Sequence, residues 1–274
     1  MPALEDNHED IIAKAMRGKS IGKSMLADAI GVGKTDIEKL LSGEVLEDVI
    51  AKIGPHLNLD AEKLLFAANK HWSPRTAETI GVMKFESDFG EMSVNSYVVF
   101  DQDSKKAWIF DTGSDCNSLI SFIEEDSLKV DSILLTHTHR DHIYCLEQLR
   151  SHFPSIDIFV HKSEQLVGTI PIEENFKLQM GTLKLNALHT FGHSVGGVTY
   201  LIDGLPCPVA IVGDAIFAGS MGGGMVSYQD ALRNNREKIM SLADPTVICP
   251  GHGPMSTIGE EKKYNPFFPE FQGN

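Results

Sequence analysis

The residue types best suited to chemistry cluster in one six-residue segment, His137-Thr138-His139-Arg140-Asp141-His142. This segment directly follows an apolar run, 133–135, that predicts a short buried strand. Side chains two residues apart on an extended chain point the same way, so His137 and His139 are placed to bind one cation together. Asp141 and His142 lie beyond the expected bend and are placed to serve a second cation. A polar loop after a strand is the alternative interpretation, but such clustering is unexpected in a chain with 11 histidines.

Three more ligand-type residues stand where an expected strand opens into a turn that contains glycine. His193 follows the apolar stretch 183–188, Asp214 follows 209–212, and His252 lies between Gly251 and Gly253. Glycine permits a sharp backbone bend at such places. The remaining histidines lie outside this pattern, and we expect surface or core positions for them, including His189, which falls at a strand end.

The elements that must position these residues alternate between strand and helix patterns. Short, mostly apolar segments predict strands at 96–100, 107–110, 133–135, 156–160, 183–188, 198–202 and 209–212. Helical spacing predicts helices at 119–125, 143–153 and 228–242. Strands in two sets with helices between them favour a layered α/β sandwich.

The first 70 residues show a different pattern, with apolar residues spaced three and four apart. We therefore expect two domains, a small all-α bundle at 1–72 and a second domain at 78–274. The first resembles the helix-turn-helix domain of small phage-repressor-type regulators, in the sequences LADAIGV at 26–32 and IEKLLSG at 37–43. Residues 1–70 carry 9 Lys or Arg and 12 Asp or Glu, a net charge of −3. A DNA-reading face should be basic, so a structural or dimerisation role is favoured, and a homodimer through this region is expected.

Charge, cysteine spacing and the length of apolar runs limit the classes of protein to which the chain can belong. The 274 residues carry 24 Lys plus Arg against 38 Asp plus Glu, a formal net charge of −14, which disfavours nucleic acid and acidic membranes as partners. The four cysteines show no CxxC spacing and predict reduced thiols. The acidic N-terminus is unlike a secretory signal, and no apolar run has the length of a membrane span. The sequence thus predicts a cytoplasmic protein that acts on a small molecule.

The motifs, in order, resemble those of the metallo-β-lactamase superfamily: HxHxDH at 137–142, GHS at 192–194, GD at 213–214 and PGH at 250–252. The resemblance covers about 80–265 and implies an αββα sandwich. Within the superfamily the chain is most similar to glyoxalase II-like hydrolases, through DAIFAG at 214–219. Carried over by position, the resemblance implies two metal sites that share one bridging carboxylate. The first site would comprise His137, His139 and His193, the second Asp141, His142 and His252, with Asp214 as the bridge. Asp111 would orient a ligand histidine.

The implied chemistry is hydrolysis. Imidazole and carboxylate ligands suit two divalent transition metals, with zinc expected and iron or manganese as alternatives. A hydroxide shared by the two metals would attack a small ester, thioester or lactone. Asp141 would accept a proton from the nucleophile. Tyr144 is a candidate donor to the oxyanion, and a packed helix tyrosine is the equally good alternative.

Two departures from glyoxalase II narrow this expectation. Only 22 residues follow His252, too few for a helical glutathione-binding domain, and Ile143 stands where that family has a lysine. The sequence therefore does not identify the substrate. Two alternatives remain: a mononuclear iron enzyme similar to persulfide dioxygenases, and a DNA-binding regulator whose metal-containing domain senses a small molecule.

Overall fold

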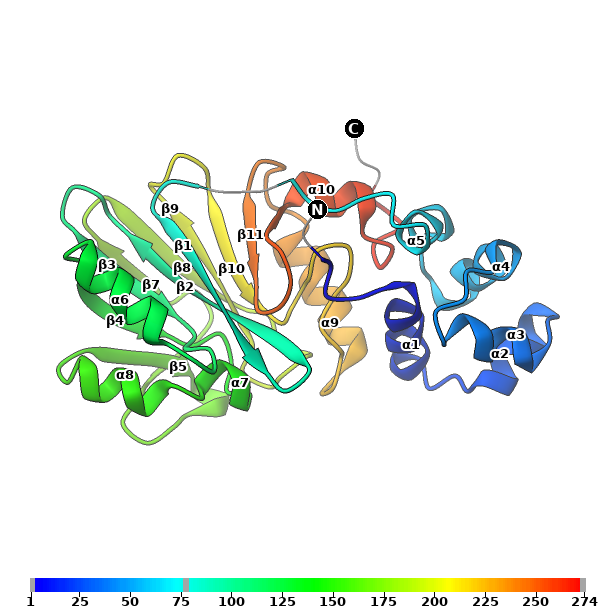
Figure 1. Cartoon of the computed structure of the whole chain (residues 1–274), viewed down its shortest axis with the longest axis horizontal. Coiled ribbons are helices and arrows are strands. Elements are labelled where there is room, and N and C mark those ends of the chain that lie inside the picture. The colour runs from blue at the N-terminus through cyan, green and yellow to red at the C-terminus, as the bar shows by residue number, and fades with distance from the viewer. Residues whose placement is uncertain (1–2, 76–78, 272–274) are drawn as a thin grey trace.

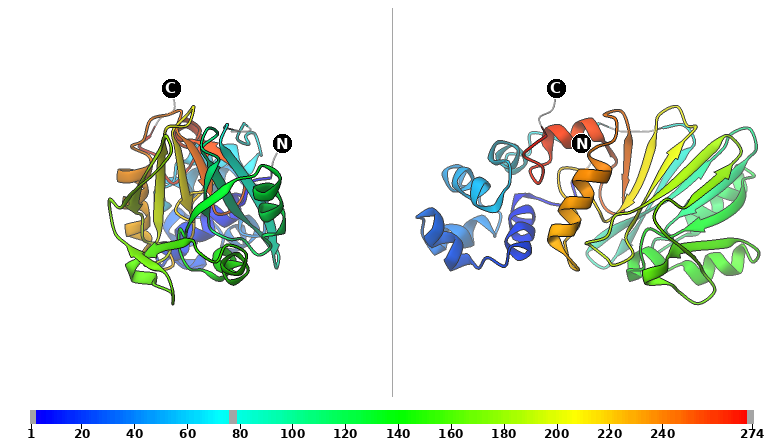
Figure 2. Two further views of the ribbon diagram at one scale, coloured as in Figure 1. Left: turned by 90° about the vertical axis from the view of Figure 1, so that its left-hand side faces the viewer. Right: turned by 180° about the vertical axis from the view of Figure 1, so that it is seen from behind.

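Two six-stranded sheets pack face to face in the computed structural model, which describes residues 3–75 and 79–271 (Figures 1 and 2). The first sheet has the order β1-β2-β3-β4-β5-β6 and the second the order β12-β11-β10-β9-β8-β7. The first comprises β1 (Val82–Phe89), β2 (Met92–Phe100), β3 (Lys106–Phe110), β4 (Lys129–Leu134), β5 (Asp157–His161) and β6 (Ile170–Ile172). The second comprises β7 (Lys177–Met180), β8 (Leu183–His189), β9 (Val198–Asp203), β10 (Val209–Gly213), β11 (Val247–Pro250) and β12 (Ser256–Thr257).

Strand periodicity divides the core into layers. Trp108 and Phe110 of β3 point between the two sheets, whereas Ile109 points outward under the helices of the first sheet. The outer face of the first sheet is covered by α6 (Asn117–Glu125) and α8 (Leu146–His152), and that of the second by α9 (Tyr228–Asn234) and α10 (Ile258–Tyr264). The prediction of an αββα sandwich is confirmed. Every predicted strand is present, while β1, β6, β7, β11 and β12 were not predicted.

The predicted helix over 143–153 is wrong in its extent. The structure has a short α7 (Arg140–Ile143) and then α8, with a break at Tyr144 and Cys145. The break arises because the backbone N–H of Cys145 donates to Thr112 Oγ1 at 3.1 Å, outside its own helix. The predicted helix 228–242 is likewise shorter, since α9 ends at Asn234 and a π-helical segment (Asn235–Ile239) follows.

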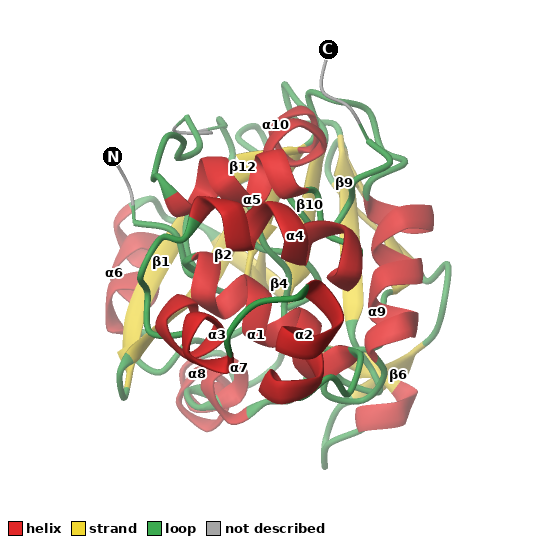
Figure 3. Ribbon diagram, turned by 90° about the vertical axis from the view of Figure 1, so that its right-hand side faces the viewer, coloured by secondary structure: helices red, strands yellow, loops and turns green. Residues whose placement is uncertain are grey.

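Five helices form the N-terminal region and cover one end of the sandwich (Figure 3). They are α1 (His8–Gly18), α2 (Lys23–Ile30), α3 (Lys34–Leu40), α4 (Glu47–Leu57) and α5 (Ala61–Ala68). Gly31 ends α2 with a φ of 67°, a left-handed conformation that glycine adopts without strain. None of the helices in the described ranges is both long and apolar enough to cross a membrane.

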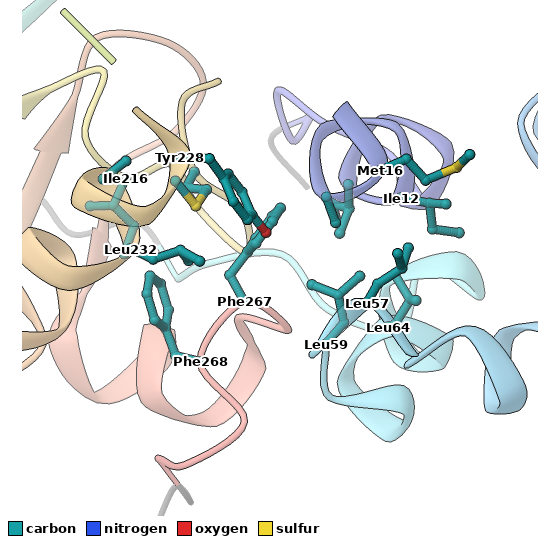
Figure 4. Packing of buried hydrophobic residues seen from close by; sticks show 14 of the residues in the cluster. Ile12, Met16, Leu57, Leu59, Leu64, Ile216, Tyr228, Leu232, Phe267 and Phe268 are labelled. Atoms are coloured by element: carbon teal, nitrogen blue, oxygen red, sulfur yellow. The ribbon is translucent and has the colours of Figure 1, made fainter. Parts of the chain in front are cut away.

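One continuous hydrophobic cluster joins the N-terminal helices to the sandwich. It includes Ile12 and Met16 of α1, and it extends to Tyr228 of α9 and Phe267 after α10 (Figure 4). In α5, the Lys63 ammonium donates to the carbonyls of Lys262, Phe268 and Phe271 near the C-terminus. The predicted boundary between 72 and 78 overlaps residues 76–78, which lie outside the described residues, and it stays a prediction.

Candidate metal centre

The seven residues predicted as ligands converge at one edge of the two sheets. Each follows the carboxyl end of a strand. His137 and His139 come after β4, Asp141 and His142 lie in α7, His193 comes after β8, Asp214 after β10 and His252 after β11. They divide into two groups, and within each group the donor atoms lie within 4.8 Å of one another.

The first group comprises His137, His139, His193 and Asp214. Nδ1 of His139 lies 3.0 Å from Nε2 of His137 and 2.9 Å from Nε2 of His193. Oδ2 of Asp214 lies 3.2 Å from Nε2 of His193 and 4.0 Å from Nε2 of His137. Four donor atoms thus lie close enough together to bind one cation.

The second group comprises Asp141, His142 and His252. Oδ2 of Asp141 lies 3.2 Å from Nε2 of His252 and 3.6 Å from Nε2 of His142. Asp214 reaches this group too, with Oδ1 3.3 Å from His142 and Oδ2 3.4 Å from His252. Its carboxylate therefore stands between both groups, as a bridging ligand would.

These donors fit divalent transition metals. Ligand bonds of about 2.0–2.1 Å in a tetrahedral arrangement place neighbouring donor atoms about 3.3 Å apart, close to the separations above. Nε2 of His142 and Oδ1 of Asp214 are buried, and neither has a hydrogen-bond partner among the described residues. Buried polar atoms without partners are rare and need an explanation, which a cation between them would give. Gly251 leaves the required room, since a Cβ there would lie 2.1 Å from Asp214 Oδ1.

Acceptors on the far side of three imidazoles turn the free nitrogens of these rings toward the centre. Nδ1 of His193 donates to the Gly223 carbonyl at 2.9 Å, and Nδ1 of His252 donates to the carbonyl of Ser93. Nδ1 of His142 donates to Asp111 Oδ2 at 2.8 Å. Such contacts fix the ring orientation and leave the Nε2 lone pair available to a metal.

Asp111 also organises the segment that carries the first two histidines. Its Oδ1 accepts from the Thr136 backbone N–H at 2.7 Å, and its Oδ2 accepts from the Thr136 hydroxyl at 2.7 Å. The Thr136 oxygen is then free to accept from Nδ1 of His137, 3.1 Å away. Asp111 has a φ of 54°, a left-handed conformation that Asp tolerates better than most residues. One carboxylate thereby orients a histidine in each group.

The carboxylates favour positive charge in the second group, which protons or a bound cation would supply, and burial favours neutral imidazoles in the first. Burial alone would lower the pKa of His142, but Asp214 and Asp111 outweigh it and raise the pKa to about 10. Burial would also lower the pKa of His252, but Asp214 and Asp141 outweigh it and raise this pKa to about 11. Burial lowers the pKa of His137 and of His193, which keeps these rings neutral, as metal ligands must be.

Glu164 is a residue beside the first group that the sequence analysis missed. It follows β5, and its carboxylate accepts from the Thr138 backbone N–H at 2.8 Å and the Thr138 hydroxyl at 3.0 Å. The other oxygen accepts from the Gly196 N–H at 2.8 Å. Thr138 lies between two ligand-type histidines and Gly196 lies three residues after His193. Glu164 therefore ties together the two loops of the first group. The one sequence signal was its place just after a strand end.

The other candidates lie at the periphery. The Tyr144 side chain is exposed, contacts Phe89 edge-on with ring centroids 6.0 Å apart, and has Arg140 over its ring. Its contact with substrate stays a prediction. His189 stacks on His161 with centroids 3.8 Å apart, outside both groups. The four cysteines are free thiols.

Comparison with known proteins places this geometry in a family. A family model described as the metallo-beta-lactamase superfamily matches residues 89–165. The probable metallo-hydrolase YqgX of Bacillus subtilis (strain 168) is 30% identical over 208 residues, covering 66% of this chain and 95% of that protein. Hydroxyacylglutathione hydrolase GloC of Haemophilus influenzae is 31% identical over 198 residues, covering 63% of this chain and 92% of that protein.

A solved structure shows the same fold. The crystal structure of BLEG-1 B3 metallo-beta-lactamase matches with a TM-score of 0.60 and 31% sequence identity, covering 68% of this chain and 99% of that one. The chain therefore belongs to the metallo-β-lactamase superfamily.

Proposed function

We propose that this member of the metallo-β-lactamase superfamily is a binuclear metallo-hydrolase that acts on a small ester, thioester or lactone. The observation that carries the proposal is the position of Asp214, whose carboxylate lies within 3.4 Å of histidines from both groups. A relative named as a hydroxyacylglutathione hydrolase supports a thioester as one substrate class. The free thiols fit the reducing cytoplasm predicted from the sequence.

The residues present would hold two cations, with zinc expected and iron or manganese as alternatives. When bound, two such metals lower the pKa of a water molecule and neutralise negative charge on the reacting carbonyl oxygen. Asp141 is placed to accept the proton that the attacking water loses, because its Oδ2 lies between the second-group histidines. Asp111, Gly223 and Ser93 hold the imidazoles in the tautomers that this requires.

The mononuclear alternative fits the geometry less well. A single cation in the first group would leave Asp141, His142 and His252 without a role, although all three side chains are buried. Nε2 of His142 and Oδ1 of Asp214 are buried without a hydrogen-bond partner among the described residues, and a second cation between them would satisfy both atoms. The arrangement therefore favours two metals over one.

The test combines metal content with turnover. We expect about two transition-metal ions per purified chain and hydrolysis of at least one member of a panel of esters, thioesters and lactones. His139→Ala should lower kcat/KM at least about a hundredfold. His152→Ala is the matched control, because His152 pairs with Glu124 at the surface. Undiminished turnover in His139→Ala would reject the proposal.

Two expectations about partners stay predictions. Homodimer formation through the N-terminal helices can be checked by sedimentation. The expected lack of DNA binding can be checked by a DNA-binding assay at low salt.

A further inference from the structure

The glycine-rich loop 219–224 lies directly against the first group of ligands. Its Gly223 carbonyl accepts the hydrogen bond from Nδ1 of His193. A Cβ on Gly222 would lie 1.8 Å from the Asp214 carbonyl oxygen and 3.2 Å from Nδ1 of His193. The path of this loop therefore decides where the His193 ring points.

The N-terminal region holds this loop in place through two charged residues. The Lys14 ammonium donates to the Met221 carbonyl at 2.8 Å and forms an ion pair with Asp6. Asp6 Oδ2 also accepts from the Ser220 hydroxyl. The side chains of Lys14 and Asp6 are only 13% and 8% exposed, so water screens this ion pair weakly.

The same segment reaches the second group. A Cβ on Gly253, next to His252, would lie 3.1 Å from the Cβ of Glu5. The Lys14 ammonium lies 4.9 Å from the centroid of the Phe217 ring, and that ring packs edge-on against His252 at 5.6 Å. Residues 5–14 thus contact the loops beside both groups of ligands.

Helix α1, which carries Lys14, is packed tightly against the sandwich. Its residues Ile11, Ile12 and Ala15 are fully or almost fully buried in the cluster shared with the sandwich. At its end Gly18 packs so closely on Tyr228 that a Cβ would lie 2.2 Å from the ring. Lys14 projects from a helix that is fixed against α9.

We propose that the N-terminal helical region is an integral part of the metal centre, in which Lys14 and Asp6 are positioning residues that clamp loop 219–224 and thereby orient His193. The inference deepens the function proposed above and rests on it for the role of the metals. Its main test measures metal binding, which does not depend on turnover of any substrate.

The test variant is Lys14→Met, which keeps most of the side-chain length and removes the ammonium. We expect the affinity for one of the two zinc ions, measured by competition with a chromogenic chelator, to fall about tenfold. Hydrogen exchange of the amides in 221–224 should become faster. Lys262→Met is the matched control. The Lys262 ammonium pairs with Asp244 at 2.7 Å and donates to the Leu242 carbonyl, and neither partner belongs to loop 219–224.

Wild-type zinc affinity and wild-type exchange in Lys14→Met would overturn the proposal. If that variant does not fold, Ser220→Ala replaces it, because it deletes only the hydroxyl that donates to Asp6. Unchanged zinc affinity in Ser220→Ala would then overturn it. A wild-type chain that binds two zinc ions but hydrolyses nothing on the panel would reject the proposed function alone.

Discussion

Replacing Glu164 with glutamine is the sharpest probe of how the first group of ligands is held. The carboxylate accepts two hydrogen bonds from Thr138 and one from Gly196. A hydrogen bond to a charged group contributes about 1.5–3 kcal/mol and a neutral one about 1 kcal/mol. The amide oxygen of glutamine retains part of this set, while its NH2 group faces one of the donors. Because Glu164 is half-buried, we expect the free energy of unfolding to fall by about 1–2 kcal/mol.

The informative readout is metal affinity rather than stability. Partners that orient ligands typically change metal affinity about ten- to a hundredfold when they are replaced. We expect one of the two zinc sites of Glu164→Gln to weaken by this factor, and the other to change little. Glu173→Gln is the control, because Glu173 pairs with Lys162 at the surface and is 67% exposed. Urea unfolding of the metal-free variants measures the stability change separately. Loss of stability with both zinc affinities unchanged would refute the reasoning.

Three further predictions test other parts of the centre. Asp111→Asn should weaken zinc binding about ten- to a hundredfold, because it weakens the acceptor for His142, and chelator competition measures this. Gly251→Ala should prevent binding of two metals, since its Cβ would collide with Asp214, and metal analysis of the folded variant checks it. Burial raises the pKa of Glu261 from its ordinary 4.5 to about 7. Its protonated form is therefore favoured on folding, and stability falls as the pH rises through this range. Glu261→Gln should be more stable than wild type by about 2–3 kcal/mol at pH 8 but not at pH 4, and urea titrations at both values measure the difference. An equal difference at the two pH values would contradict it.

The sequence predicted the parts of the centre that depend on local spacing. His137 to His142 fall in one segment, and the other ligand-type residues stand in glycine-bearing turns after strands, so their types and positions marked them as candidate ligands. Their division into two sites came from the family resemblance. The sandwich followed from apolar periodicity. Strand β1 was not predicted. None of its side chains is fully buried, so its sequence lacks the apolar pattern of a core strand.

What the sequence could not show are contacts between residues far apart in the chain. Ser220 and Asp6 are separated by 214 positions, and Lys14 and Met221 by 207. No spacing rule connects such residues, and an exposed position is the ordinary interpretation of a charged side chain such as Asp6 or Lys14. The sequence also could not identify the backbone carbonyls of Ser93 and Gly223 as acceptors for imidazoles. Every residue has a backbone carbonyl, and only the fold determines which two of them contact the histidines.

The contacts of Lys63 have a consequence for biosynthesis. Its ammonium is held by three carbonyls from the last residues of the described chain, and Phe267 and Phe268 complete the cluster around the first helices. Domains usually fold in order as they leave the ribosome, the earliest part first. Here the first helices cannot complete their core until residues 262–271 have been synthesised. The stability of the first helices therefore depends on a segment made about 205 residues after Lys63.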